Sequence, residues 1–394
     1  MSRIAKYGFS ALLLILIGIG LSGCSYTWRV VSNIDWSKMD ASALDFGDLP
    51  SVPLHPSPTP IPISNASNDV NLSSFVFTPE YGDGDMGTPV AIDQLDQWLA
   101  DHATSAFLVL HKGEVIYERH FQAPEEVPMH KAFSMTKSFL SLLIGISIER
   151  GEIKSVDDLV IEYVPEIDQE GSEGLTIRHL LMNMAGFAYP RGLTPWNIRT
   201  RMYYTYDVRN VLEGADFNRQ PGLIFVPEEL SPLLLNWILE RATGKKFIDI
   251  LQERLWNPMG MQYPAIANID SVESDFAKVE SGLVAHVRDL AKLGLLVNNQ
   301  GRVGSNQLVP SHWMQESTLG GSDAYNKVQH KYLWWNLERE NEVFDIFANG
   351  HHGQRIYASP SDDIVVVRMG IYSGGVHWNY SIRDMVVGFR KALG

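Results

Sequence analysis

The segment 134–150 constrains the fold more than any other part of the chain, because it predicts a helix that must be buried. Apolar side chains occupy almost every side of this helix, and Gly151 follows it as a stop signal. A helix that is apolar all round lies in the core of a protein, so other elements must surround it. Its apolar residues are Phe139, Leu140, Leu142, Leu143, Ile144, Ile146 and Ile148.

Two polar residues, Ser134 and Lys137, stand at the beginning of this helix. They are three residues apart, so their side chains share a face, and burial of the helix places both in a crevice. The helix N-terminus and burial both disfavour a charged ammonium, so a partly neutral Lys137 can accept the proton of Ser134. Ser–Lys pairs are one known form of activated serine. The alternative is an N-cap serine beside a solvated lysine, because Ser-x-x-Lys also occurs by chance.

Strand-like runs lie near both ends of the chain, with a long and mostly helical stretch between them. This order predicts an α+β fold, in which an antiparallel sheet flanked by helices carries an inserted helical subdomain at about 150–300. The predicted elements are a hairpin at 107–121 around Lys112-Gly113, strands at 344–348, 355–359 and 363–369, and a closing amphipathic helix at 380–393.

The N-terminus has the features of a bacterial lipoprotein signal. A positively charged start precedes an apolar run at 11–21, which is too short for a comfortable membrane span. Cys24 then completes Leu-Ser-Gly-Cys, which looks like a lipobox. We therefore expect 1–23 to be a signal peptide and Cys24 to carry lipid; the alternative is a chance cysteine after a signal anchor. Ser25 after the cysteine favours the outer membrane of a bacterium, with the domain facing the periplasm.

The segment 24–82 predicts a spacer, because from about residue 45 it is rich in Pro, Ser and Asn and shows little hydrophobic periodicity. Such a composition is typical of a semi-stiff tether that lifts a domain off a membrane. The alternative is a loop packed on the domain. In either case we expect the folded domain to cover 83–394.

Charge and cysteine content exclude several classes of function. A net charge of -14 and a pI near 5.3 argue against a nucleic-acid binder, which needs a basic surface. A single cysteine excludes a disulfide framework and any zinc or iron–sulfur site built from cysteines. The adjacent His351 and His352 lack a carboxylate-linked ligand spacing, so we expect no metal and no organic cofactor.

Motifs spread from about residue 93 to the C-terminus carry a family resemblance. They are Phe-Ser-Met-Thr-Lys at 133–137, Leu-Thr-Ile-Arg-His-Leu-Leu-Met-Asn-Met-Ala-Gly-Phe at 175–187, Pro-Gly-x-x-Phe at 221–225, Ser-Gly-Leu at 281–283, Trp-Trp at 334–335 and His-Gly-Gln at 352–354. Together they resemble the serine beta-lactamase and penicillin-binding-protein superfamily, on its class C and DD-peptidase-like branch. Within it, the 6-aminohexanoate-dimer hydrolase and carboxylesterase members look most similar. The resemblance implies a beta-lactamase/transpeptidase-like fold.

The resemblance also implies roles for individual residues. Ser134 is the acylated nucleophile and Lys137 is its base. His351-His352-Gly353 matches the third family motif, His-x-Gly, and the backbone N–H of Gln354 then shares the oxyanion with that of Ser134. In an alternative register, 348–350 takes this place and His351 donates instead. The expected site residues are Ser134, Lys137, His351 and Gln354 as catalytic groups, and Glu229, Trp335 and Gly353 as substrate-binding groups, with Trp334-Trp335 forming either a substrate wall or plain core.

One position departs from the family pattern. Pro227 stands where the family has a tyrosine that relays protons, and Glu229 stands where it has an asparagine. Proline carries no proton-donating group, so the candidates for a replacement are Glu228, Glu229, or a tyrosine from the segment 203–206. If nothing replaces the tyrosine, activity is low or lost, because one acid–base group contributes roughly 10²–10⁴-fold.

These observations lead to one hypothesis and two alternatives. We expect a lipid-anchored periplasmic serine hydrolase that cleaves an amide or ester through an acyl-serine intermediate, without a cofactor. A catalytically weakened module that binds cell-wall peptide or a partner protein is the first alternative. A true DD-peptidase or beta-lactamase is the second. The sequence of the loops at 190–218 does not identify the substrate.

Overall fold

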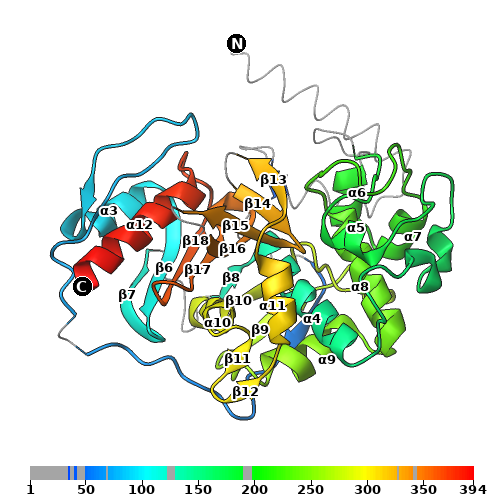
Figure 1. Ribbon diagram of the computed structural model, residues 1–394, viewed down its shortest axis with the longest axis horizontal. Coiled ribbons are helices and arrows are strands. Elements are labelled where there is room, and N and C mark those ends of the chain that lie inside the picture. Colours follow the sequence, from blue (N-terminus) through cyan, green and yellow to red (C-terminus); the bar gives the residue numbers. More distant parts are fainter. Residues whose placement is uncertain are drawn as a thin grey trace.

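An antiparallel sheet lies at the centre of the computed structural model (Figure 1). Its strands are β6 (Thr104–His111), β7 (Glu114–His120), β13 (Ser322–Tyr325), β14 (Val328–Lys331), β15 (Trp334–Glu338), β16 (Phe344–Asn349), β17 (Arg355–Ser359) and β18 (Ile364–Gly370). Among the described residues the sheet has eight strands, in the order β13-β14-β15-β16-β17-β18-β6-β7. The predicted hairpin, the three late strands and the pairing of both chain ends in one antiparallel sheet are confirmed.

Helices cover both faces of this sheet, and the alternation of side chains along β6 shows how. Phe107 belongs to the core beneath α3 (Ile92–Asp101) and α12 (Trp378–Leu393), whereas the neighbouring Leu108 belongs to the core shared with α10 (Val287–Asn298). Successive side chains of a strand point to opposite faces, so a strand between two helical layers is apolar throughout. The predicted closing helix is therefore confirmed as α12, which begins two residues earlier than expected.

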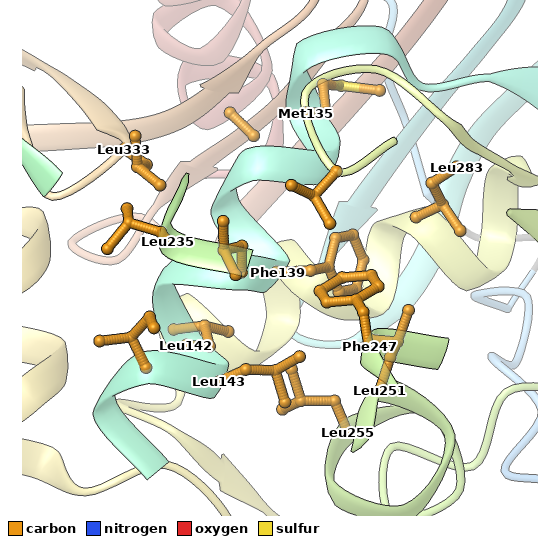
Figure 2. Packing of buried hydrophobic residues seen from close by; sticks show 14 of the residues in the cluster. Met135, Phe139, Leu142, Leu143, Leu235, Phe247, Leu251, Leu255, Leu283 and Leu333 are labelled. Atoms are coloured by element: carbon orange, nitrogen blue, oxygen red, sulfur yellow. The ribbon is translucent and has the colours of Figure 1, made fainter. Parts of the chain in front are cut away.

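The helical layer beside the sheet is built around the buried helix that the sequence predicts. This helix is α4 (Thr136–Glu149), and Figure 2 shows its Phe139, Leu142 and Leu143 packed among apolar side chains of neighbouring elements. The helices that pack against it are α8 (Leu230–Thr243), α9 (Phe247–Leu251) and α11 (Ser311–Thr318). Beyond α8 lie α5 (Ile177–Leu181) and α7 (Val208–Glu213), which contact α8, and α6 (Ile198–Tyr204), which contacts α7. The predicted helical subdomain at about 150–300 is too long at its C-terminal end, because α10 packs on the sheet instead.

The described residues of 49–82, which precede the predicted domain, pack against the rest of the molecule. Residues of β3 (Ser51–Leu54) pair with β9 (Ala265–Asn268) in a small second sheet that also contains β10 (Leu283–His286) and β8 (Met129–Lys131). Further along, the backbone N–H of Val115 donates to Ser64 O, and β4 (Val76–Phe77) pairs with β5 (Val90–Ala91). The apolar side chains of this segment that lie in the core are Leu49, Leu54, Ile63, Phe75 and Phe77.

This packing corrects the expected domain boundaries. A free tether over 24–82 is wrong for the described residues from 49 onward, and the alternative of a packed loop holds there. Its physical basis is the burial of isolated apolar side chains together with backbone hydrogen bonds to β9 and β7, neither of which needs periodicity in the sequence. The folded domain therefore includes the described residues of 49–82, ahead of the expected start at 83.

The signal-peptide prediction lies outside the part of the chain that the structure describes, as does Cys24. Within the described part, no helix combines the length and the apolar character needed to cross a membrane. The described residues are 34–35, 40–41, 49–67, 70–121, 129–189, 198–325, 328–339 and 344–394.

Three histidines of the folded domain are held in the neutral form by burial. Burial lowers the pKa of His130 to about 3, and the charges of His120 and His286 act in the same direction. Burial also lowers the pKa of His330 to about 3 and that of His286 to about 4. Protonation of these side chains therefore favours the unfolded chain, in which a histidine takes up a proton near pH 6.5.

We expect the free energy of unfolding to fall as the pH falls from about 6.5 toward 4. Between those values the unfolded chain binds protons that the folded chain does not, and the loss is about 1.4 kcal/mol per pH unit for each such histidine. Urea unfolding of wild type and His130→Gln at several pH values measures the slope, which should become smaller in the variant. His312→Gln, at a side chain that is 66% exposed, is the matched control and should leave the slope unchanged. A wild-type unfolding free energy that is constant with pH would contradict this assignment.

Candidate active site

Ser134 lies in a tight turn that leads into α4. The turn is the 3-10 segment Phe133–Met135, so the helix proper begins at Thr136, two residues later than predicted. Phe133 has φ 48°, a left-handed conformation that is costly for a bulky side chain. The hydroxyl of Thr136 donates to Phe133 O at 2.7 Å, and Ala132 N donates to Leu283 O at 2.8 Å. These bonds hold the backbone on both sides of Ser134 in one conformation.

Lys137 is largely enclosed, with 12% of its side chain exposed. Its Nζ donates to the backbone oxygen of Glu228 at 3.2 Å and lies 4.0 Å from Glu229 Oε1. No hydrogen bond between Ser134 Oγ and Lys137 Nζ is found among the described contacts. Catalytic hydrogen bonds are often long before substrate binds, so this geometry is compatible with a Ser–Lys pair.

The two glutamates after Pro227 have different environments. The carboxyl of Glu228 is buried and accepts hydrogen bonds from the backbone N–H groups of Leu230 and Ser231, so it caps α8. Burial raises the pKa of Glu228 to about 7, while the hydrogen bonds from Ser231 and the nearby charge of Lys137 act in the opposite direction. Glu229 instead lies beside Lys137. This is the position that we expected from the sequence for a residue of the site.

Tyr189 is a site residue that the sequence analysis missed. Its hydroxyl donates to Glu229 Oε2, so it joins the group around Lys137 from the segment that follows α5. The only signal in the sequence is its position two residues after the recognised run at 175–187. Tyr203, one of the expected candidates, has its hydroxyl directed to Lys131, which donates to it at 2.6 Å. Of the other two candidates, Tyr204 is buried and Tyr206 is 40% exposed.

The end of β16 forms the other side of the site and decides between the two expected registers. Gly350 lies against the Ser134 turn: a Cβ added there would be 2.5 Å from Ala132 O and 3.2 Å from Met135 Cγ. The register in which 348–350 is the third motif therefore brings its glycine next to Ser134. In that register the expected oxyanion donors are the backbone N–H groups of Ser134 and His351. The Ser134 N–H lies at the start of the turn, where the helix supplies no acceptor.

The other register is contradicted. The backbone N–H of Gln354 donates to His351 O at 3.2 Å, so it is used inside the turn, and its side chain forms two hydrogen bonds with the backbone of Gly370. Gly353 packs against Arg368 and Trp378, in the core rather than in the cleft. Gln354 as an oxyanion donor and Gly353 as a substrate contact are therefore wrong. A local motif cannot show which of two nearby glycines faces the nucleophile.

Two buried arginines hold the turn at 350–354 from behind. Arg355 donates through Nη1 to Gly350 O at 3.2 Å and to Gln354 O at 2.7 Å. Arg368 donates to His352 O at 2.7 Å and stacks 4.0 Å above the ring of Trp378. The carbonyl groups of the turn are thereby tied to the sheet, so its N–H groups keep a fixed direction.

Aromatic side chains border the site. Trp335 is partly exposed and lies 5.0 Å from the ring of His330 and 6.1 Å from that of Phe225, whereas Trp334 is buried in the core. The charge of Lys137 contributes, after burial, to the lowered pKa of His330, so these rings lie near the lysine. This arrangement favours Trp335 as a wall and Trp334 as core. His330 was not recognised from the sequence, because no motif surrounds it.

His351 and His352 also lie beside the nucleophile turn. Their rings are 5.7 Å and 5.4 Å from the ring of Phe133 and 4.2 Å from each other. His352 has φ 57°, which turns the chain so that both rings reach Phe133. In the described ranges, no group of three or more His, Cys, Asp or Glu side chains is arranged to hold a metal ion. The two histidines pack against the turn through these ring contacts.

Comparison with known proteins identifies the family. The family model described as Beta-lactamase matches residues 93–370, well over half of the chain. The chain belongs to the beta-lactamase family. It is 26% identical over 331 residues to the 6-aminohexanoate-dimer hydrolase of Paenarthrobacter ureafaciens, a match that covers 77% of this chain and 82% of that protein. The predicted family resemblance is therefore confirmed.

Several solved structures share the fold of this chain. A Bacillus anthracis protein assigned as a 6-aminohexanoate-dimer hydrolase has a TM-score of 0.75 at 21% identity, covering 89% of this chain and 92% of that one. A D-stereospecific amidohydrolase from Streptomyces sp. has a TM-score of 0.57 at 16% identity, covering 75% and 96% of the two chains. The beta-lactamase/transpeptidase-like fold is confirmed, and it is the fold of a serine hydrolase.

We expect Gly350→Ala to slow acylation of Ser134 roughly 10²-fold, because the new Cβ has no room and pushes the turn away from the nucleophile. The rate of labelling by a fluorophosphonate measures the effect. Gly214→Ala is the matched control, since its Cβ would meet only Asn210 O at an ordinary 3.6 Å. Equal labelling rates for the two variants would contradict the placement of β16 beside Ser134.

Proposed function

We propose that this beta-lactamase-family protein hydrolyses an amide or ester bond through an acyl intermediate on Ser134. The observation that carries the proposal is the meeting of Ser134, the enclosed Lys137 and the end of β16 at one place. The match to a 6-aminohexanoate-dimer hydrolase over most of both chains supports a small amide or ester as the substrate. A cell-wall peptide is a second substrate class, supported by a 25% identity to penicillin-binding protein 4* of Bacillus subtilis over 41% of this chain.

The chemistry follows from the positions of the groups. Ser134 Oγ attacks the carbonyl carbon while its proton passes to Lys137, and the backbone N–H groups of Ser134 and His351 stabilise the oxyanion. The C–N or C–O bond then breaks, and the leaving group takes the proton from Lys137. Water cleaves the resulting ester and regenerates the serine hydroxyl.

A binding module with little turnover is the alternative function. Pro227 in place of a proton-carrying side chain favours it, as does the Lys137 Nζ bond to a backbone oxygen. The two functions differ in the fate of the acyl group. An enzyme releases it and turns over, whereas a weakened module reacts slowly and keeps the adduct.

We expect Ser134→Ala to abolish covalent labelling by a fluorophosphonate and to lower ester hydrolysis roughly 10³-fold or more. Lys137→Ala should have nearly the same effect, because the two residues act as a unit. Ser141→Ala is the matched control: it lies on the same helix, and its buried hydroxyl has no hydrogen-bond partner among the described atoms. Near-UV circular dichroism verifies folding, and a fluorescent penicillin tested in parallel distinguishes beta-lactam binding. Equal hydrolysis by wild type and Ser134→Ala would disprove the assignment.

We further propose that the mature protein begins at Cys24, carries lipid there and faces the periplasm from the outer membrane. The support is the short apolar run followed by Leu-Ser-Gly-Cys at 21–24. Cys24→Ala should move the protein out of the membrane fraction or leave it uncleaved, while its hydrolytic activity stays unchanged. Mass analysis of the N-terminus measures this. Recovery of intact peptides spanning 1–24 as the main wild-type species would contradict the proposal.

A further inference from the structure

The carboxylate of Glu229 joins Lys137 to Tyr189, two residues from different elements. Its Oε1 lies 4.0 Å from Lys137 Nζ, while its Oε2 accepts the hydroxyl hydrogen of Tyr189. The side chains of Lys137 and Glu229 are 12% and 21% exposed, so water weakens their attraction less than it would at the surface. We propose that Glu229 and Tyr189 position Lys137 and hold its proton during acylation of Ser134, an inference that rests on the function proposed above.

The backbone before α8 explains why Glu229, rather than its neighbour, faces the lysine. The carboxyl of Glu228 turns inward to cap α8 through Leu230 N and Ser231 N, while its backbone oxygen accepts from Lys137. Pro227 fixes φ and lacks an N–H, so it restricts the approach of the chain to this cap. Two consecutive residues therefore hold the same ammonium, one through its carbonyl and the other through its carboxylate.

The segment that carries Tyr189 is itself anchored. The ring of Phe187 stacks on that of Phe217 at 4.6 Å, and Ala188 N donates to Asp216 O at 2.7 Å. These contacts fix the backbone immediately before Tyr189. Its hydroxyl can therefore orient the Glu229 carboxylate without depending on substrate.

Each proton that moves during acylation has a defined donor and acceptor. The amine of Lys137 takes the proton of Ser134 as the Oγ–C bond forms, and the Glu229 carboxylate stabilises the ammonium that results. When the C–N or C–O bond breaks, Lys137 gives this proton to the leaving group and returns to the amine. Tyr189 keeps its own proton throughout and donates a hydrogen bond to Glu229. Both residues act through Lys137 and touch no reacting atom, so they are positioning residues.

The test measures burst and steady-state hydrolysis of an activated ester across pH. Glu229→Gln should lower kcat about 10²-fold with little change in KM. Glu229→Asp, which keeps the carboxylate, should retain more activity than Glu229→Gln. Tyr189→Phe should lower kcat roughly 10-fold. The double variant should be no slower than Glu229→Gln alone, because the tyrosine acts only through the carboxylate.

A second tyrosine–carboxylate pair serves as the control. It shows whether the loss of such a hydrogen bond away from Lys137 affects hydrolysis. Tyr163 donates to Asp158 at 2.6 Å, and neither has a described contact with Lys137. Tyr163→Phe and Asp158→Asn should leave kcat and the pH profile unchanged.

Three outcomes separate the possible failures. If Ser134→Ala hydrolyses like wild type, the proposed function itself is wrong. If Ser134→Ala is inactive but Glu229→Gln keeps the wild-type kcat, only the positioning role is wrong. If the losses from Glu229→Gln and Tyr189→Phe multiply, the two residues act separately and the chain from tyrosine to lysine is overturned. Should Glu229→Gln fail to fold, Tyr189→Phe and Glu229→Asp carry the same test.

Discussion

The burial of α4 is the constraint on which the rest of the molecule depends. Each large apolar side chain that it buries contributes about 1.5–3 kcal/mol, so the helix is stable only when other elements enclose it. Gly145 lies so close to the ring of Trp313 that an added Cβ would be 2.3 Å away. With its sides enclosed in this way, α4 presents Lys137 in its first turn, next to Ser134, and this is where β16 ends and the segment before α8 lies.

Much of the fold follows from periodicity in the sequence, and the exceptions have physical causes. The strands β6 and β18 contain long apolar runs because helices cover both of their faces, and such runs are recognisable without a structure. The segment from 49 to 82 was misjudged because proline and serine dominate it. Scattered side chains such as Leu54 and Phe75 are enough to fasten it, and the hydrogen bonds of β3 involve only the backbone. The helix α10 was assigned to the wrong layer because an amphipathic pattern shows that one face of a helix is buried but not which element covers that face.

The site was predictable only where its residues are neighbours in the chain. Ser134 and Lys137 follow from one helix, and Glu229 follows from its place after a recognised motif. The register near Gly350 could not be derived, since it depends on Arg355 and Arg368 pulling the turn toward the sheet. Tyr189 and His330 come from separate elements with no motif of their own. Their part in the site arises from tertiary packing alone, which a single sequence does not display.

The pairing of β6 with β18 affects the order in which the protein folds. These strands are more than 250 residues apart, and hydrogen bonds over such separations form slowly. The turn at 350–354 beside Ser134 also depends on the pairing of β6 with β18 and on the packing of α12. This is because Arg368 lies on β18 and Arg355 is held by Asn379 of α12. A chain in which β18 and α12 are not yet in place therefore lacks the side chains that tie the turn at 350–354 to the sheet. We expect the reactivity of Ser134 to appear only once both elements have packed.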